Sequence, residues 1–414
     1  MSSFSIESVR ANFPALQERP DRKPYIFFDG PGGTQMAQQT IDGMLGYISG
    51  GMANLHGTFA TSRATDALLD AGRQGVADLL NCQPQEVAFG QNMTSLAFAI
   101  ARSLATFLRA GDEVVVTELD HRANVDPWVT LAKDCGAEVK FIPVNPETYT
   151  LELAQLDELI TTNTKLVAVT MSSNVVGTVP PIEQIIARAK AVGAWVVLDA
   201  VHATPHYPID FQKLGADVLF CSAYKFFGPH LGIAVVSAGL FEQLPVYKLA
   251  PAPGYIPDKL ETGTQNHEGI AGLLGALAFI ETLGEGSTRP QRLRTAMHAI
   301  EVHEQAQANR LETFLRGLPQ VHVYRAPADT RKTPTVAFII ENVNSREACA
   351  WFAEHYNMAI ADGHFYASTL AEKLGIMAQG GWIRLGLAPY NTDQEIELFQ
   401  TALLAFLREV RKSE

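Results

Sequence analysis

Between about residues 75 and 240, short apolar runs rich in β-branched residues alternate with stretches of helical character. The runs are EVAFG, EVVVTEL, EVKFIPV, KLVAVTM, WVVLDA, DVLFCSA and GIAVVS. Strands that are apolar along their whole length are buried on both faces, so helices must cover both sides of a mostly parallel sheet. The pattern therefore predicts an α/β fold whose large domain contains a mostly parallel seven-stranded sheet.

Helix boundaries are marked beside these runs. NMTSLAFAIARSLATFL begins with an Asn/Thr cap, and TVPPIEQIIARAKAVG has prolines at its start and glycine at its end. After a long amphipathic stretch at 287–317 come the strand-like TPTVAFIIE and GWIRLGLA and the helical SREACAWFAEHY and DQEIELFQTALLAFLREV. This order predicts a large domain at 21–285 and a smaller C-terminal α+β domain at 286–414, on which residues 1–20 pack.

Length, charge and cysteine usage exclude several classes of protein. The chain has 414 residues, too many for one compact core, and its formal net charge of -12 argues against nucleic acid or an anionic membrane as partner. We find no signal peptide at the start and no apolar run long enough to span a membrane. The four cysteines have no metal or redox spacing, so we expect free thiols, a cytoplasmic protein and no metal site.

Reactive side chains follow several of the predicted strands. In open α/β sheets, ligands bind at the carboxyl ends of strands. Here those ends carry Asp120, His121, Asn174, Asp199, His202, Ser222, Tyr224 and Lys225. In VAFGQNMTS a strand runs into a helix start, whose unpaired N–H groups suit a phosphate. An anion-binding helix start, a carboxylate, an aromatic group and a lysine together match the needs of pyridoxal phosphate (PLP).

In this interpretation Lys225 forms the Schiff base, and Asp199 keeps the pyridine nitrogen protonated so that the ring can accept electrons. Desolvation should lower the pKa of the free lysine. Each residue taken alone has an ordinary alternative. Asp199 could simply cap a helix, and Lys225 could extend toward solvent or form an ion pair. The combination, in order and at strand ends, favours a cofactor site.

Segments throughout the chain resemble the fold-type I PLP-dependent transferases of the class V aminotransferase group, most closely the cysteine desulfurase and selenocysteine lyase branch. They are YIFFDGPGGT, NLHGTFATSRATD, ELDHRANVDPW, SSNVVGTVPPI, VVLDAVHATPHYPIDF, ADVLFCSAYKFFGPHLG, ETGTQNHEGIAGL and GWIRLGLAPYNTDQEI. The resemblance runs from about residue 25 to 400. It implies a homodimer with a shared active site that acts on a small amino acid.

The resemblance also implies cofactor contacts. Lys225 corresponds to the Schiff-base lysine, Asp199 to the partner of the pyridine nitrogen, His121 to the residue that stacks on the ring, and His202 to the residue against the ring hydroxyl. Further implied contacts are the phosphate ligands Gln91, Asn92 and Ser222, then Tyr224 before the lysine, and Thr264, donated to the phosphate of the neighbouring subunit. On the substrate side, Asn174 and Arg384 resemble a clamp for the substrate carboxylate, a task that suits a guanidinium group, and His56 belongs to the same set.

One loop departs from the desulfurase pattern. In those enzymes a segment reading roughly Arg-x-Gly-His-His-Cys-Ala carries the cysteine that takes sulfur as a persulfide. The matching segment is IADGHFYAST at 360–369, in which Ala361 stands in place of the arginine and Tyr366 in place of the cysteine. A persulfide relay needs an accessible thiolate, which tyrosine cannot supply. Tyr366 is instead expected to donate a proton to a leaving group or to shape the pocket.

The sequence therefore predicts a PLP-dependent transferase or lyase, with cleavage of the C–S bond of cysteine or a related amino acid as the leading reaction. Arg384 binds the substrate, and freed Lys225 acts as the base at the α-carbon. One alternative keeps the cofactor and changes the reaction to epimerisation, transamination or a kynureninase-like cleavage. The other is a non-catalytic protein that uses the fold for binding, against which the intact Lys225 and Asp199 argue.

Overall fold

A seven-stranded sheet forms the larger lobe of the computed structural model, which describes residues 5–18 and 24–413. Its strands are β2 (Val87–Gly90), β3 (Glu113–Thr117), β4 (Glu138–Ile142), β5 (Thr164–Thr170), β6 (Trp195–Asp199), β7 (Val218–Ser222) and β8 (Gly232–Val236). They follow the order β2-β8-β7-β6-β5-β3-β4, and all neighbours are parallel except the two pairs that β8 makes. The predicted mostly parallel sheet is confirmed, and each strand lies at one of the predicted apolar runs.

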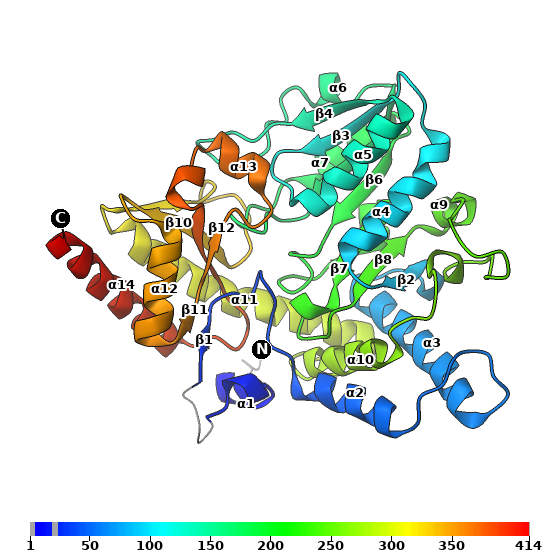
Figure 1. Cartoon of the computed structure of the whole chain (residues 1–414), viewed down its shortest axis with the longest axis horizontal. Helices are drawn as coiled ribbons and strands as arrows, with labels where there is room; N and C mark the ends of the chain where they lie inside the picture. The colour runs from blue at the N-terminus through cyan, green and yellow to red at the C-terminus, as the bar shows by residue number, and fades with distance from the viewer. Residues whose placement is uncertain (1–4, 19–23, 414) are drawn as a thin grey trace.

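Helices pack against the large sheet on both faces (Figure 1), and successive side chains of its central strands belong to different apolar clusters. Val197 of β6 belongs to a cluster with residues of α4 (Met93–Leu104), α5 (Asp126–Cys135) and α9 (Ala238–Gln243). Its neighbours Val196 and Leu198 belong to a second cluster with residues of α3 (Ala60–Leu80), α7 (Ile182–Ala191) and α10 (His267–Glu281). Alternation along the strand therefore buries both faces of the sheet, and each such side chain contributes roughly 1.5–3 kcal/mol.

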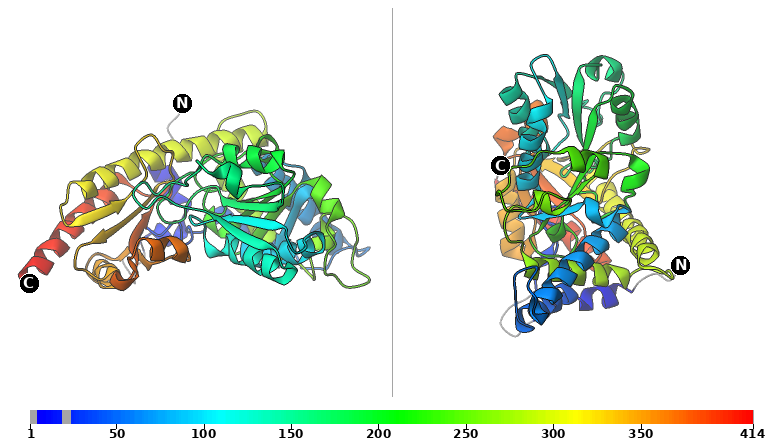
Figure 2. Two further views of the ribbon diagram at one scale, coloured as in Figure 1. Left: turned by 90° about the horizontal axis from the view of Figure 1, so that it is seen from above. Right: turned by 90° about the vertical axis from the view of Figure 1, so that its right-hand side faces the viewer.

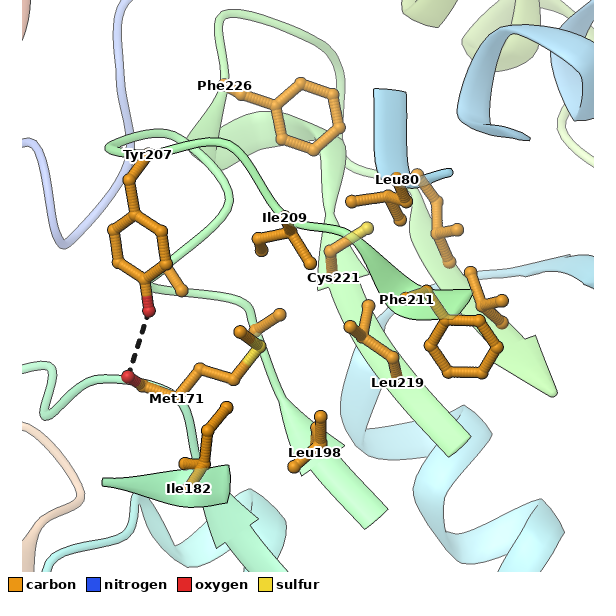
Figure 3. Packing of buried hydrophobic residues seen from close by; sticks show 14 of the residues in the cluster. Leu80, Met171, Ile182, Leu198, Tyr207, Ile209, Phe211, Leu219, Cys221 and Phe226 are labelled. Atoms are coloured by element: carbon orange, nitrogen blue, oxygen red, sulfur yellow. Dashed lines mark hydrogen bonds between the residues drawn. The ribbon is translucent and has the colours of Figure 1, made fainter. Parts of the chain in front are cut away.

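Cys221 of β7 belongs to the second cluster. Figure 3 shows it among Ile209, Leu219 and Phe226, in the middle of packed apolar side chains. Burial raises the pKa of its thiol. Cys221 therefore acts as a small hydrophobic residue in the core.

The smaller lobe contains a four-stranded antiparallel sheet. Its strands, in the order β12-β13-β10-β9, are β9 (Val321–Tyr324), β10 (Thr335–Ile340), β12 (Ala361–Gly363) and β13 (Trp382–Gly386). Helices α12 (Ser345–Tyr356) and α14 (Asp393–Ser413) pack on it in a third apolar cluster. The predicted α+β character of this part is confirmed. The partly exposed edge strand β9 and the three-residue β12 were not predicted, because neither forms a continuous apolar run.

Helix α11 (Arg289–Arg316) joins the two lobes. A capping box between Thr288 and Gln291 begins the helix. Its first half contributes Leu293 and Met297 to the second cluster, and its second half contributes Leu311 to the cluster of the smaller lobe. Figure 2 shows the helix running along both lobes. One continuous helix with two buried halves therefore links the two cores.

The N-terminal segment contacts both lobes. Arg10 of α1 (Ile6–Ala11) pairs with Glu395 of α14 at 2.8 Å, while Phe13 meets Phe279 of α10 edge-on, with ring centroids 5.0 Å apart. Residues 1–4 and 19–20 of the segment predicted to pack on the smaller domain, and the predicted boundary at residue 21, lie outside the described residues. The domain limits stay a prediction.

The remaining short elements complete the chain. A parallel pair joins β1 (Ile26–Phe27) to β11 (Met358–Ala359). The other helices are α2 (Gln38–Ser49), α6 (Leu156–Leu159), α8 (Phe211–Leu214) and α13 (Ser368–Lys373). Within residues 5–18 and 24–413, we find no helix that combines the length and apolar character needed to cross a bilayer.

Candidate active site

A cavity of about 580 Å³ lies at the carboxyl ends of β5, β6 and β7, and residues of the smaller lobe complete its wall. The predicted site residues that line it are Asn92, His121, Asn174, Asp199, His202, Ser222, Tyr224, Lys225, Tyr366 and Arg384. Parallel strands end at the same edge of a sheet, which is why side chains distant in sequence meet there. The cavity therefore brings together most of the predicted site.

Lys225 lies in a short 3-10 turn, Ala223–Lys225, that directly follows β7. Its Nζ donates a hydrogen bond to the carbonyl oxygen of Pro31 and lies 4.7 Å from the centroid of the Tyr224 ring. Burial, followed by the positive charge of Arg384, lowers the pKa of the Lys225 amine to about 7. A substantial fraction of the amine is therefore neutral near pH 7, the form that attacks an aldehyde.

Asp199 ends β6 and is buried. Its Oδ1 accepts a hydrogen bond from the backbone N–H of Val201 at 2.9 Å. Burial raises the pKa of Asp199 to about 6, while the Val201 N–H and the charge of Lys225 act in the opposite direction. A buried carboxylate of this kind gains from a cationic partner such as a protonated ring nitrogen.

A chain of hydrogen bonds between buried side chains holds the turn that carries His121. The carboxyl group of Asp120 accepts from the Thr117 hydroxyl and, at 2.7 Å, from the Asn124 amide, whose oxygen accepts from Trp128 Nε1 at 3.1 Å. Burial raises the pKa of Asp120 to about 8. The Asp120 carboxyl therefore orients the turn from inside the core.

The His121 ring is a neutral aromatic surface on the cavity wall. Its Nδ1 accepts from the backbone N–H of Ala123 at 3.0 Å, which places the ring hydrogen on Nε2. Burial, followed by the charges of Lys225 and Arg384, lowers the pKa of His121 to about 4. A neutral imidazole in this position suits stacking against a flat ligand ring.

His202 connects the cavity to the smaller lobe. Its Nε2 forms hydrogen bonds with the hydroxyl groups of Thr333 at 3.0 Å and Thr335 at 2.9 Å. Its Nδ1 has no hydrogen-bond partner among the described residues. Sequence reasoning missed both threonines, because they lie more than a hundred residues away, in β10 of the other lobe or just before it.

The start of α4 forms one end of the cavity. Asn92 caps the helix, its Oδ1 accepting from the backbone N–H of Ser95 at 2.9 Å, and Met93 and Thr94 also line the cavity. Gly232 of β8 permits this close approach, since a Cβ there would lie 2.3 Å from the carbonyl carbon of Asn92. The positive end of the α4 dipole therefore faces the cavity and suits an anionic group.

The guanidinium group of Arg384, in β13 of the smaller lobe, is buried on the cavity wall. Its Nη1 donates to the carbonyl oxygen of Asn174 and its Nη2 to Oδ1 of Asp29, both at 2.9 Å. The ring centroid of Phe365 lies 3.7 Å from its Cζ. Asp29 is partly exposed to the cavity, so it can give way to an incoming carboxylate. Sequence reasoning assigned no role to Asp29, which lies in a segment that carried the resemblance, or to Phe365, which lies in the loop that departs from it.

The loop that carries Tyr366 closes over this wall. Phe365 and Tyr366 both have a positive φ, of 51° and 57°, a conformation that non-glycine residues adopt only when neighbours hold it. The Asn174 amide donates to the carbonyl oxygen of Phe365 at 2.9 Å, and the backbone N–H of Arg122 donates to the carbonyl oxygen of Tyr366 at 2.8 Å. The Tyr366 side chain is 65% exposed at the cavity mouth, with its ring 5.3 Å from that of His121.

The cysteines are not part of the cavity wall. None of the residues lining it is a cysteine. The four thiols, Cys82, Cys135, Cys221 and Cys349, are free, and burial raises the pKa of each. Each thiol is therefore held in its protonated, weakly nucleophilic form.

Three predicted site residues do not line the cavity of this chain. Gln91 is exposed just before the α4 cap, and Thr264 is exposed in the segment before α10. His56 is exposed between α2 and α3, with its Nδ1 3.2 Å from Oδ1 of Asp66. Their assignment to the site stays a prediction.

Comparisons with known proteins identify the family of the chain. A cysteine desulfurase of Yersinia pestis (strain Pestoides F) is 31% identical over 426 residues, covering 99% of each chain. The structure of the cysteine desulfurase CsdA from Escherichia coli matches with 27% identity and a TM-score of 0.85, covering 98% of this chain and 99% of its own. The apo cysteine desulfurase of Thermococcus onnurineus NA1 matches with 26% identity and a TM-score of 0.88, covering 99% and 100%. Because the class-V aminotransferase profile matches residues 26–399, the chain belongs to this family of PLP-dependent enzymes.

Proposed function

We propose that this chain binds PLP in the cavity at the ends of β5, β6 and β7 and cleaves the C–S bond of cysteine or a related amino acid. The observation that carries the proposal is the presence of a buried amine, a buried carboxylate and a buried guanidinium, those of Lys225, Asp199 and Arg384, in one cavity. The similarity to cysteine desulfurases over nearly the whole chain supports the choice of reaction.

The residues of the cavity fit the cofactor. The neutral Lys225 amine would bond its aldehyde carbon, Asp199 would pair with its ring nitrogen, and His121 would stack on its ring. The unpartnered Nδ1 of His202 would meet the ring hydroxyl, and the α4 start with Asn92 and Ser222 would hold the phosphate. When bound, PLP supplies an electron sink for negative charge at the substrate α-carbon.

The remaining work falls to side chains of this chain. Arg384 would hold the substrate carboxylate by two N–H groups once Asp29 gives way. Phe365 covers the face of the guanidinium and keeps water from it. The neutral amine of Lys225 would take the proton from the substrate α-carbon, a role that its lowered pKa favours.

Product analysis with cysteine tests the reaction. Transfer of sulfur to give alanine requires a nucleophilic thiol, and none lines the cavity. We therefore expect elimination, in which the C–S bond breaks, sulfide leaves, and water releases pyruvate and ammonia. Sulfide and pyruvate should form in equal amounts, measured by colorimetric and coupled assays. Alanine as the main product would instead indicate a desulfurase, and exchange of the α-hydrogen without sulfide would contradict C–S cleavage.

Tyr366 provides a matched variant for this assay. Because its side chain is largely exposed at the cavity mouth, Tyr366→Phe should leave the products unchanged and the rate within a few-fold. A large loss of rate would make the phenol a proton donor to the leaving group.

We further propose that the chain works as a homodimer with a shared active site. Large apolar side chains are exposed on α2 and on the loop that follows it, Leu45, Ile48, Met52 and Phe59, and the exposed Tyr255 lines one pocket with His56 of that loop. Exposed apolar groups gathered in this way mark interaction surfaces, and His56 lies in the same region. Leu45→Glu combined with Met52→Glu should shift the sedimentation coefficient to that of a monomer and lower the PLP content. A wild-type monomer with full PLP content would contradict the shared site.

The cytoplasm is the location we propose for this enzyme. The four cysteines are free, as expected in a reducing compartment. Recovery in an oxidising compartment on cell fractionation would contradict this.

A further inference from the structure

His202 forms hydrogen bonds across the boundary between the two lobes. It follows β6 in the larger lobe, whereas its partners Thr333 and Thr335 lie in or next to β10 of the smaller lobe. His202 is 5% exposed, Thr333 1% and Thr335 0%. Bulk water therefore does not reach these groups, and each buried hydroxyl hydrogen needs an acceptor within the protein.

The acceptors within reach decide where the hydroxyl hydrogens lie. Oγ1 of Thr333 has two acceptors within reach, Nε2 of His202 at 3.0 Å and the carbonyl oxygen of Gly177 at 3.3 Å. At the 3.5 Å contact between the two hydroxyl groups, Thr333 is again the one placed to donate. The acceptor that remains for the Thr335 hydroxyl among the described residues is Nε2 of His202. Since Nε2 then accepts, a neutral His202 ring must carry its hydrogen on Nδ1.

The surroundings keep His202 neutral. Burial, followed by the charges of His206, Arg384 and Lys225, lowers the pKa of His202 well below its usual value. His206 meets the His202 ring edge-on, with centroids 5.0 Å apart, and its own Nδ1 lies 2.8 Å from Oε2 of Glu304 on α11. The titratable groups around the ring are thus His206, Glu304, Lys225, Arg384 and, at the end of β6, Asp199.

We propose that Thr335 is a positioning residue, whose hydroxyl donates to Nε2 of His202 and so presents an N–H donor at Nδ1 to the cofactor cavity. This rests on the proposed binding of PLP. The ring hydroxyl of PLP bonded to a lysine amine carries negative charge, which an N–H donor stabilises and an imidazole lone pair repels. A strand of the smaller lobe thereby sets the charge state of the cofactor without contacting it.

The test compares absorbance spectra of the PLP-loaded wild type and variants across a pH titration. Thr335→Val keeps the shape of the side chain and removes the donor, so the His202 hydrogen should move to Nε2 and leave a lone pair at Nδ1. We expect part of the absorbance to shift from the visible to the near-ultraviolet band. The midpoint of the pH titration of this absorbance should rise by about one pH unit. A shift of that size corresponds to the free energy of one lost hydrogen bond to a charged group. Thr335→Ser keeps the donor and should titrate like the wild type.

Further variants test whether another group can replace the Thr335 hydroxyl as the donor to His202. Thr333 could rotate to donate in place of Thr335, so the double variant Thr333→Val with Thr335→Val should give at least the same shift. In a His202→Gln background the amide brings its own N–H groups, and Thr335→Val should then have no effect on the midpoint. Thr335→Cys, with a weaker donor of similar size, should give a smaller shift and replaces the valine variant if that does not fold.

The outcomes separate this inference from the proposed function. If the wild type binds PLP and both valine variants titrate like it, Thr335 does not control the tautomer of His202, and the proposed function stands. If the wild type itself shows no absorbance of lysine-bonded PLP, the proposed function is wrong.

Discussion

Lys225→Ala should lower kcat with cysteine by about 10³-fold or more and remove the visible absorbance of PLP bonded to the protein. The side chain is expected both to bond the cofactor and to move the proton at the α-carbon, and general-base catalysis alone contributes about 10²–10⁴-fold. Lysine-bonded PLP is followed by absorbance and turnover by sulfide release. Retained turnover would overturn the assignment of Lys225.

A second buried lysine provides the control. Nζ of Lys259 donates to the carbonyl oxygens of Glu242 and Leu244, at 3.1 and 2.9 Å, and the residue does not line the cavity. Lys259→Ala is expected to cost some stability but to keep the absorbance. Equal loss in both variants would point to general unfolding rather than to the bond with PLP.

The pKa of Lys225 adds a pH dependence to the same measurement. The amine is protonated below about pH 7 and neutral above it, and only the neutral form attacks the aldehyde. When PLP is added to cofactor-free protein, the rate at which the visible absorbance develops should therefore rise with pH through about 7. A rate that stays constant from about pH 6 to about pH 8 would contradict this assignment.

Arg384→Ala should raise KM for cysteine by about 100-fold while changing the affinity for PLP only a few-fold. Removing one partner of a buried, hydrogen-bonded charge pair costs about 2–5 kcal/mol, and 1.4 kcal/mol corresponds to a factor of ten. Arg384→Lys keeps the charge but not the planar pair of donors, so its KM should lie between that of the wild type and that of Arg384→Ala. Steady-state kinetics and PLP titration measure these effects separately.

Asp29 makes this test more specific. Nη2 of Arg384 donates a hydrogen bond to Oδ1 of Asp29, so Asp29 competes with the substrate carboxylate for the guanidinium group. Asp29→Asn should weaken this competition and lower KM for cysteine. A loss of PLP that exceeds the change in KM in the Arg384 variants would show that Arg384 supports the cofactor rather than the substrate carboxylate.

Much of the larger lobe could be predicted because buried parallel strands leave a local signature. WVVLDA and DVLFCSA are apolar along their length, as expected for strands of a sheet that is covered on both faces. Strands β6 and β7 form at these two segments. Their strand ends then place Asp199 and Lys225 at one edge of the sheet, whatever the rest of the chain does. β9 is a partly exposed edge strand and β12 has three residues, so neither carries such an apolar run.

The contacts that complete the site could not be predicted in this way. Asp29 reaches Arg384 because the segment after β1 pairs with the end of β13, where Asp29 bridges to Gly386. Phe365 reaches the same guanidinium through a loop held by Asn174. Nothing in the periodicity of these segments states which distant segment each will contact.

The amino-acid sequence by itself determined the strands of the large sheet and the reactive side chains at their ends, because strand period and burial are local properties. Only the tertiary structure decided that Thr335 would form a hydrogen bond with His202 and that Asp29 would accept one from Arg384. Those pairings depend on how the two lobes pack, and the free energy of that packing is spread over residues far apart in the chain.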